Sequence, residues 1–290
     1  MNQWDHKKHP TILFTCSRGD YRLRQLLNDD YNFESCLRLL SLKDQLQVRN
    51  VKHNKQLALL SRLFLKCAVN FALLSIYPDH PRGLWEEIEF EYNEHGKPEI
   101  KGRPFAYNNS NSNDLSCIAI LLEATAVGVD LSHEEQDSVS STEFMSQFEG
   151  IFGGSEVEQL NSIKTTSERY NAFNHLWTLK EAFTKYLGCG LNIDLSLFSF
   201  GLTEVPENGC LPQQSDSKLT NYDIDWVECL VDSSKVHHDL LKLDPTMHCY
   251  STTLKVCDKL PVIASIITNC QAEASGIHLD LYEILKNEII

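Results

Sequence analysis

The sequence has few of the features that mark nucleic-acid-binding, zinc-binding or secreted proteins. Its 290 residues include 26 lysines and arginines against 40 aspartates and glutamates, which gives a formal net charge of −14. An excess of acid disfavours binding to a phosphate backbone, so we expect no nucleic acid among its partners. Any site for an anionic small molecule must then be a local basic pocket in an acidic body.

The ten cysteines form no C-x-x-C pair and have no zinc-site spacing, so we expect small buried side chains in a reducing compartment. The segment from Met1 to Pro10 is polar and has no signal-peptide character. The longest apolar stretch, from Leu57 to Tyr77, is interrupted by a polar stripe of residues four apart: Arg62, Lys66 and Asn70. This pattern predicts an amphipathic helix facing the core, and a cytoplasmic protein with no membrane partner.

Hydrophobic periodicity predicts an α+β fold. Helices are expected at 20–30, 46–74 and 167–187, the last ending at Gly188, with a short helix begun by a capping box of Ser155 and Glu158. Strands are expected at 11–16, 88–92, 117–122, 126–131, 197–202, 222–230 and 261–268, with 117–122 and 126–131 as a hairpin. The repeated order of elements predicts two α+β halves of similar plan, residues 1–125 and 126–290.

Three segments carry residues suited to phosphate or metal chemistry, and each also has an ordinary structural interpretation. Asp130, in Gly-Val-Asp at a strand end, suits either a hard cation or a turn. Glu181 and Lys185 lie four apart on one face of a helix, as catalytic groups or as a solvated ion pair. Lys97, in His-Gly-Lys-Pro, can meet a phosphate or simply be exposed on a turn.

Five short motifs follow one another along the chain: G-K-P, N-x-S-x-S, G-V-D, W-x-x-K-E-x-x-x-K and G-x-G-L. In this order they resemble the motifs of the Sfp-type 4′-phosphopantetheinyl transferases, and the resemblance runs from about Leu46 to Phe200. The segment from Gly188 to Leu197 makes it most similar to the enzymes that activate aminoadipate reductase in fungal lysine biosynthesis. The resemblance implies antiparallel sheets in two halves with a pseudo-twofold arrangement, and an active site in the cleft between them. A monomer would already supply both walls of that cleft.

The activity that the resemblance implies is transfer of the 4′-phosphopantetheine moiety of coenzyme A to a serine of an apo-carrier protein, with Mg²⁺ and release of 3′,5′-ADP. The apo-carrier domain of aminoadipate reductase is the expected acceptor. The residues implied are Asp130 and Glu181 for the metal, Glu181, Lys180 and Lys185 for catalysis, and Gly96, Lys97, Pro98, Ser110, Asn111 and Lys185 for coenzyme A. Further basic contacts could come from Lys52, Lys55 and Arg62.

Two positions depart from the family pattern. Asn111 stands where the family has a histidine, and Ser132 stands where it has a second acid. These departures keep open a catalytically impaired relative that binds coenzyme A or a carrier protein as a scaffold. A third interpretation is an acidic interaction protein with no small-molecule ligand. In that case the motifs would occur on its surface by coincidence. Retention of four family residues together favours the active transferase: Asp130, Glu181, Lys180 and Lys185.

Overall fold

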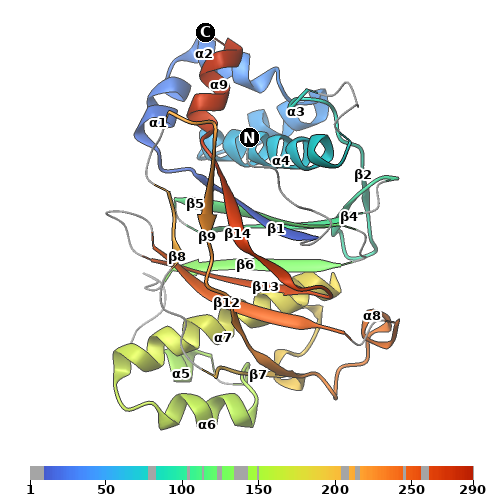
Figure 1. The fold of residues 1–290 in the computed structure, drawn as a ribbon, viewed down its shortest axis with the longest axis vertical. Coiled ribbons are helices and arrows are strands. Elements are labelled where there is room, and N and C mark those ends of the chain that lie inside the picture. Colours follow the sequence, from blue (N-terminus) through green and yellow to red (C-terminus); the bar gives the residue numbers. More distant parts are fainter. Residues whose placement is uncertain are drawn as a thin grey trace.

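The computed structural model describes residues 10–77, 83–102, 105–112, 114–122, 126–133, 143–148, 150–203, 209–212, 216–243, 246–255 and 261–289. Its elements form four layers, in which two sheets face each other and each is covered by helices on its outer side (Figure 1). This is an α+β fold with mainly antiparallel sheets, as the sequence predicts.

The first sheet joins strands from both ends of the chain. Its order is β4 (Phe105–Ser112), β5 (Leu115–Leu122), β1 (Thr11–Ser17), β14 (Ala272–Leu279) and β9 (Leu219–Asp223). The β1–β14 pair is parallel, and the other pairs are antiparallel. The C-terminal strand and the helix after it therefore pack with N-terminal elements. The division at residues 125 and 126 stays a prediction.

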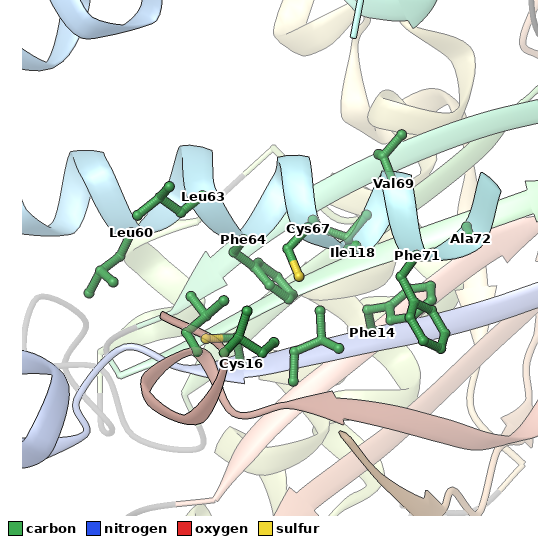
Figure 2. Close-up of a cluster of buried hydrophobic side chains, with 14 of the residues drawn as sticks. Phe14, Cys16, Leu60, Leu63, Phe64, Cys67, Val69, Phe71, Ala72 and Ile118 are labelled. Carbon is green, nitrogen blue, oxygen red and sulfur yellow. The ribbon is translucent and has the colours of Figure 1, made fainter. Parts of the chain in front are cut away.

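Five helices cover the outer face of this sheet: α1 (Tyr21–Asn28), α2 (Asp30–Leu37), α3 (Leu42–Asn50), α4 (Lys55–Ile76) and α9 (Leu281–Ile289). The helix predicted at 46–74 is two helices, separated at residues 51–54, where Asn54 has a left-handed backbone. Figure 2 shows Phe64, Cys67 and Phe71 of α4 packed over Phe14 and Cys16 of β1.

Within the described residues, α4 alone is long and apolar enough to cross a membrane, and most of its most apolar window is buried inside the protein. Of its polar stripe, Asn70 is fully buried, while Arg62 and Lys66 are half-buried. Lys66 Nζ donates to the carbonyl of Leu39, and Asn70 Nδ2 donates to those of Leu84 and Glu86. The helix is therefore a core helix, as predicted, and its polar side chains bind neighbouring segments.

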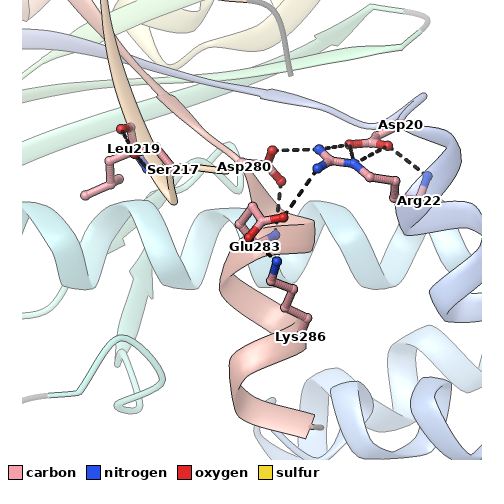
Figure 3. A network of polar contacts seen from close by, with 7 residues as sticks. All are labelled: Asp20, Arg22, Ser217, Leu219, Asp280, Glu283 and Lys286. Atoms are coloured by element: carbon pink, nitrogen blue, oxygen red, sulfur yellow. Dashed lines mark hydrogen bonds and ion pairs between the residues drawn. The ribbon is translucent and has the colours of Figure 1, made fainter. Parts of the chain in front are cut away.

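An ionic network fastens α9 to α1 (Figure 3). Arg22 lies 2.7 Å from both Asp20 and Asp280 and 3.4 Å from Glu283. Glu283 in turn pairs with Lys286. Since Asp20 also caps the start of α1, one arginine connects the first helix of the chain with the last.

The second sheet has the order β10 (Val227–Glu228), β12 (His248–Lys255), β13 (Val262–Thr268) and β6 (Val127–His133), with β8 (Gly209–Cys210) beside β12. Its outer face is covered by α7 (Thr166–Leu187), which packs with α5 (Phe144–Gln147) and α6 (Gly154–Ser162). Smaller elements are β2 (Phe90–Tyr92), β3 (Pro98–Ile100), β7 (Ser199–Gly201), β11 (Leu230–Asp232), α8 (Asp239–Leu243) and 3₁₀ turns at Gly190–Asn192 and Leu195–Leu197.

Two further local predictions are wrong. The expected hairpin of 117–122 and 126–131 does not form, because β5 pairs with β4 and β1 while β6 pairs with β13 in the other sheet. The helix α6 is capped at Gly153 by the side chain of Glu156, and not by Ser155 and Glu158. The expectation that the cysteines are buried agrees with the structure. Eight cysteines with described side chains are free, and seven of these are buried.

A buried histidine ties α7 to the second sheet. His175 is fully buried, with Nδ1 2.7 Å from Ser251 Oγ and Nε2 3.3 Å from Thr253 Oγ1. Burial lowers the pKa of His175 to about 3, because the imidazolium would lose its water.

We predict that His175 makes the protein acid-sensitive. Its neutral form contributes stability fully above the unfolded pKa near 6.5, and the contribution is lost as pH falls toward 3. Inside that window the loss approaches about 1.4 kcal/mol per pH unit. Urea unfolding from pH 7 to pH 4 should show a shallower pH dependence for His175→Gln than for the wild type. The matched change at exposed His53 should leave the slope unaltered, and equal slopes for all three proteins would contradict the prediction.

Candidate active site

The site is organised by a close contact between β6 and α7. A Cβ atom on Gly128 would lie 2.0 Å from the carbonyl oxygen of Ala182 and 2.5 Å from the amide nitrogen of Tyr186. Only glycine allows the two backbones to approach this closely. Alternate residues of a strand share a face, so Asp130 also points toward α7.

Asp130 and Lys185 meet at this contact, and Glu181 lies one helical turn before Lys185 on α7. Lys185 Nζ donates to Asp130 Oδ1 at 2.7 Å and to the Val129 carbonyl at 3.1 Å. Glu181 is half-buried one helical turn earlier. Burial is the main cause that raises the pKa of Glu181, and the charge of Asp130 raises it further, while Lys185 opposes the shift. The two carboxylates are therefore electrostatic neighbours.

The N-x-S-x-S segment connects the two sheets beside this cluster. Asn108, Ser110 and Ser112 are alternate residues of β4, so their side chains share one face. Their partners on β6 are the Val129 N–H, the Asp130 carboxylate with the Leu131 N–H, and the His133 ring. Ser110 Oγ donates to Asp130 Oδ1 at 2.8 Å and accepts from Leu131 N–H at 3.2 Å. Ser110 thus orients the carboxylate of Asp130.

The two positions that depart from the family pattern lie close to this segment. Asn111 is exposed, and its Oδ1 accepts a hydrogen bond from Ser116 Oγ. Ser132 is buried two residues after Asp130, and its hydroxyl donates to the carbonyl of His133. Position 132 therefore supplies a hydroxyl group where a carboxylate would extend the acidic cluster.

Lys180 is not brought to the cluster. Its side chain is fully buried on another face of α7, with Nζ 2.9 Å from Glu156 Oε2. The same ammonium donates to the carbonyls of Leu195 and Phe198 at 2.9 and 2.7 Å. Burial lowers the pKa of Lys180 and raises that of Glu156, and the contact between them opposes both shifts. The pair joins α6, α7 and the chain that follows α7.

The other residues predicted to contact coenzyme A lie outside the cluster of Asp130, Glu181 and Lys185. Gly96 has a φ of 82° in the turn between β2 and β3, and Lys97 Nζ donates to backbone carbonyls at the end of α7. Lys52 and Lys55 are exposed, and Arg62 donates to Gln47 on α3.

The donor set at Asp130 and Glu181 fits a magnesium ion. Mg²⁺ prefers carboxylate oxygens and commonly keeps several waters, so two carboxylates can hold it without a complete protein shell. Across the described part of the chain, no cluster of three or more histidines, cysteines or acids exists that could bind a metal by itself. The cluster is suited to an ion that also takes ligands from water or from a phosphate.

Residues 126–231 match the family model of the 4′-phosphopantetheinyl transferase superfamily. That segment contains β6, α7 and all three residues of the cluster. The similarity to this superfamily therefore covers the part of the chain that forms the cluster.

Several 4′-phosphopantetheinyl transferases are similar to this chain in sequence. The L-aminoadipate-semialdehyde dehydrogenase-phosphopantetheinyl transferase of Eremothecium gossypii is 30% identical over 177 residues, which are 60% of each chain. The enzyme of that name from Candida glabrata is 31% identical over 61% of this chain and 66% of its own length. A 4′-phosphopantetheinyl transferase of Bacillus pumilus is 35% identical over 41% of this chain and 48% of its own. The alignments thus span 48% to 66% of these relatives.

We predict that Gly128→Ala disrupts the packing of α7. The added methyl group overlaps backbone atoms that cannot move independently, and overpacking of this kind costs typically about 1–3 kcal/mol. Urea unfolding measures the loss. Gly154→Ala is the matched control, because a Cβ there meets nothing within 4 Å at the first turn of α6. Equal stability of the two variants would refute the importance of this contact.

Lys180→Met should destabilise the fold, because it leaves the buried carboxylate of Glu156 without its cation. Breaking one partner of a buried ion pair typically costs about 3–5 kcal/mol. Adding Glu156→Gln should restore part of the loss, since it removes the uncompensated charge. Denaturant unfolding of both variants provides the measurement. An unchanged unfolding free energy for Lys180→Met, together with lost activity, would instead favour direct participation in catalysis.

Proposed function

We propose that this chain transfers the 4′-phosphopantetheine moiety of coenzyme A to a serine of an apo-carrier protein and releases 3′,5′-ADP. The convergence of Asp130, Glu181 and Lys185 carries the proposal. Two neighbouring carboxylates suit a divalent ion, and an adjacent ammonium suits a diphosphate. The similarity of residues 126–231 to the superfamily supports the same activity.

Glu181 is the proposed base. Its raised pKa makes it a stronger proton acceptor than an exposed glutamate. It removes the proton from the carrier serine, directly or through a water molecule. The serine oxygen forms a bond to the β-phosphorus of coenzyme A, and the bond from that phosphorus to the bridging oxygen breaks. The electron pair leaves with 3′,5′-ADP.

Asp130 and Glu181 would hold Mg²⁺, which supplies charge neutralisation at the diphosphate. Lys185 donates hydrogen bonds to the phosphate oxygens, and these strengthen as negative charge develops on the leaving group. Ser110 keeps the Asp130 carboxylate oriented. Gly96, Pro98 and Asn111 remain proposed contacts of coenzyme A, and Lys180 remains a proposed catalytic residue.

The acceptor belongs to the same proposal. Because the fungal relatives are named for L-aminoadipate-semialdehyde dehydrogenase, we propose the carrier domain of aminoadipate reductase, in lysine biosynthesis. We also propose that the two halves are related by a pseudo-twofold axis, and that coenzyme A occupies a cleft between them. The two facing sheets, each with its own helical layer, support this arrangement. We also propose that the protein is cytoplasmic and monomeric.

The decisive experiment incubates the protein with coenzyme A, Mg²⁺ and the apo-carrier domain, and then determines the mass of the carrier. Gain of one phosphopantetheine arm supports the transferase. Binding of coenzyme A without transfer would favour a protein that acts as a scaffold. If the protein neither binds coenzyme A nor transfers its arm, the interpretation as an interaction protein remains. A carrier domain from fatty-acid synthase, tested in parallel, measures acceptor range.

Glu181→Gln should lower the transfer rate by roughly 10²–10⁴-fold, the usual contribution of a general base. The amide keeps the size of the side chain but removes its basicity and its negative charge. Single-turnover mass measurements at saturating Mg²⁺ give the rate. The exposed Glu158 on α6 provides the matched control, and Glu158→Gln should transfer at the wild-type rate. A near-normal rate for Glu181→Gln would exclude Glu181 as the base.

A further inference from the structure

The side chain of Lys97 is inserted between two elements of the site. Lys97 follows Gly96 in the turn between β2 and β3. Its Nζ lies 2.6 Å from the carbonyl oxygen of Lys185, 3.3 Å from that of Tyr186 and 3.3 Å from that of Val127. The first two carbonyls belong to the last turn of α7, and the third belongs to the first residue of β6.

These three acceptors match what an ammonium group requires. Lysine has three N–H donors, and each of them has a carbonyl within reach here. The last carbonyls of a helix have no partner inside the helix, and they form the negative end of its dipole. Burial lowers the pKa of Lys97 to about 8, so its bonds offset a real desolvation cost.

A second side chain of the same turn also binds the end of α7. Asn93 Nδ2 donates to the carbonyl of Gly188 at 3.2 Å, while Asn93 Oδ1 accepts from the N–H of His95 and Lys97. Gly188 has a φ of 72°, and a Cβ there would lie 2.9 Å from Asn93 Nδ2 and 3.1 Å from Lys97 Cδ. The turn therefore packs directly on the helix end.

We infer that Lys97 is a positioning residue, whose ammonium fixes the last turn of α7 against the start of β6 and so sets Lys185 and Glu181 opposite Asp130. The inference rests on the proposed function. Lys97 holds the main-chain carbonyl of Lys185 while the side chain of Lys185 reaches Asp130 at 2.7 Å. Val127 lies three residues before Asp130 on the same strand. A displacement of about 1 Å at a reacting group can reduce a rate by about 10²-fold.

The experiment uses the full chain with Lys97→Met, which keeps the length of the side chain but removes the donors, and Lys97→Arg, which restores a cation. Lys101→Met is the matched control, since Lys101 is exposed at the end of the same hairpin. The measurements are kcat, the KM for coenzyme A, and amide hydrogen exchange of residues 184–188 without ligand.

For Lys97→Met we expect kcat to fall by about 10- to 100-fold, the KM for coenzyme A to stay within about twofold, and exchange at 184–188 to accelerate. Lys97→Arg should recover part of kcat and of the protection. Lys101→Met should match the wild type. A raised KM with unchanged exchange would overturn the inference and make Lys97 a cofactor contact. Unchanged kcat and unchanged exchange would overturn it as well.

Two further features keep the test decisive. If Lys97→Met does not fold, Asn93→Ala removes the weaker contact to Gly188 and should accelerate the same exchange, and unaltered protection would again overturn the inference. If the wild type transfers nothing, the proposed function fails. The exchange measurements then still decide whether Lys97 holds the end of α7.

Discussion

Gly128 lets the main chain of β6 lie directly against the main chain of α7, and the geometry of the candidate site follows from that approach. A strand and a helix usually keep the distance that their side chains require. At this point one of those side chains is absent, so the carboxylate of Asp130 reaches the ammonium of Lys185 at 2.7 Å. The same proximity places Glu181 within the electrostatic range of Asp130. The arrangement of these three charged groups therefore depends on a backbone contact.

Polar groups in the interior stabilise this arrangement from several sides. Lys97 holds the last turn of α7, His175 fastens its middle to β12, and Lys180 joins it to α6. Each group bonds with a specific partner, so each restricts how the helix can rotate or slide. Apolar packing alone tolerates small shifts more readily than directional hydrogen bonds do. This restriction fixes the positions of Glu181 and Lys185 on the helix.

Asp130, Glu181 and Lys185 were identified through the resemblance to the Sfp-type 4′-phosphopantetheinyl transferases, because each of their motifs alone also had an ordinary structural interpretation. Those motifs are local signals in the sequence, and the structure brings the side chains of Asp130 and Lys185 into contact. The burial of Lys180 also had a local signal, since it occupies the apolar stripe of Phe173, Leu176 and Phe183. Its partner Glu156 was harder to identify, because the cap it forms uses a glycine.

The sheet pairing could not be derived in the same way. Neighbouring apolar strands separated by a few residues usually form a hairpin, yet β5 and β6 enter different sheets. Their partners lie far away in the sequence, and β13 follows β6 by about 130 residues. The strands β12 and β14 were not predicted at all. No local pattern specifies the register between residue 13 and residue 276.

The parallel pairing of β1 with β14 has a consequence for how the chain acquires its structure. During synthesis β1 emerges long before β14 exists, so one edge of β1 remains without hydrogen-bond partners until β14 has left the ribosome. Distant contacts of this kind form slowly, and unpaired edges invite association with other nascent chains. A cell making this protein would gain from chaperones that shield that edge.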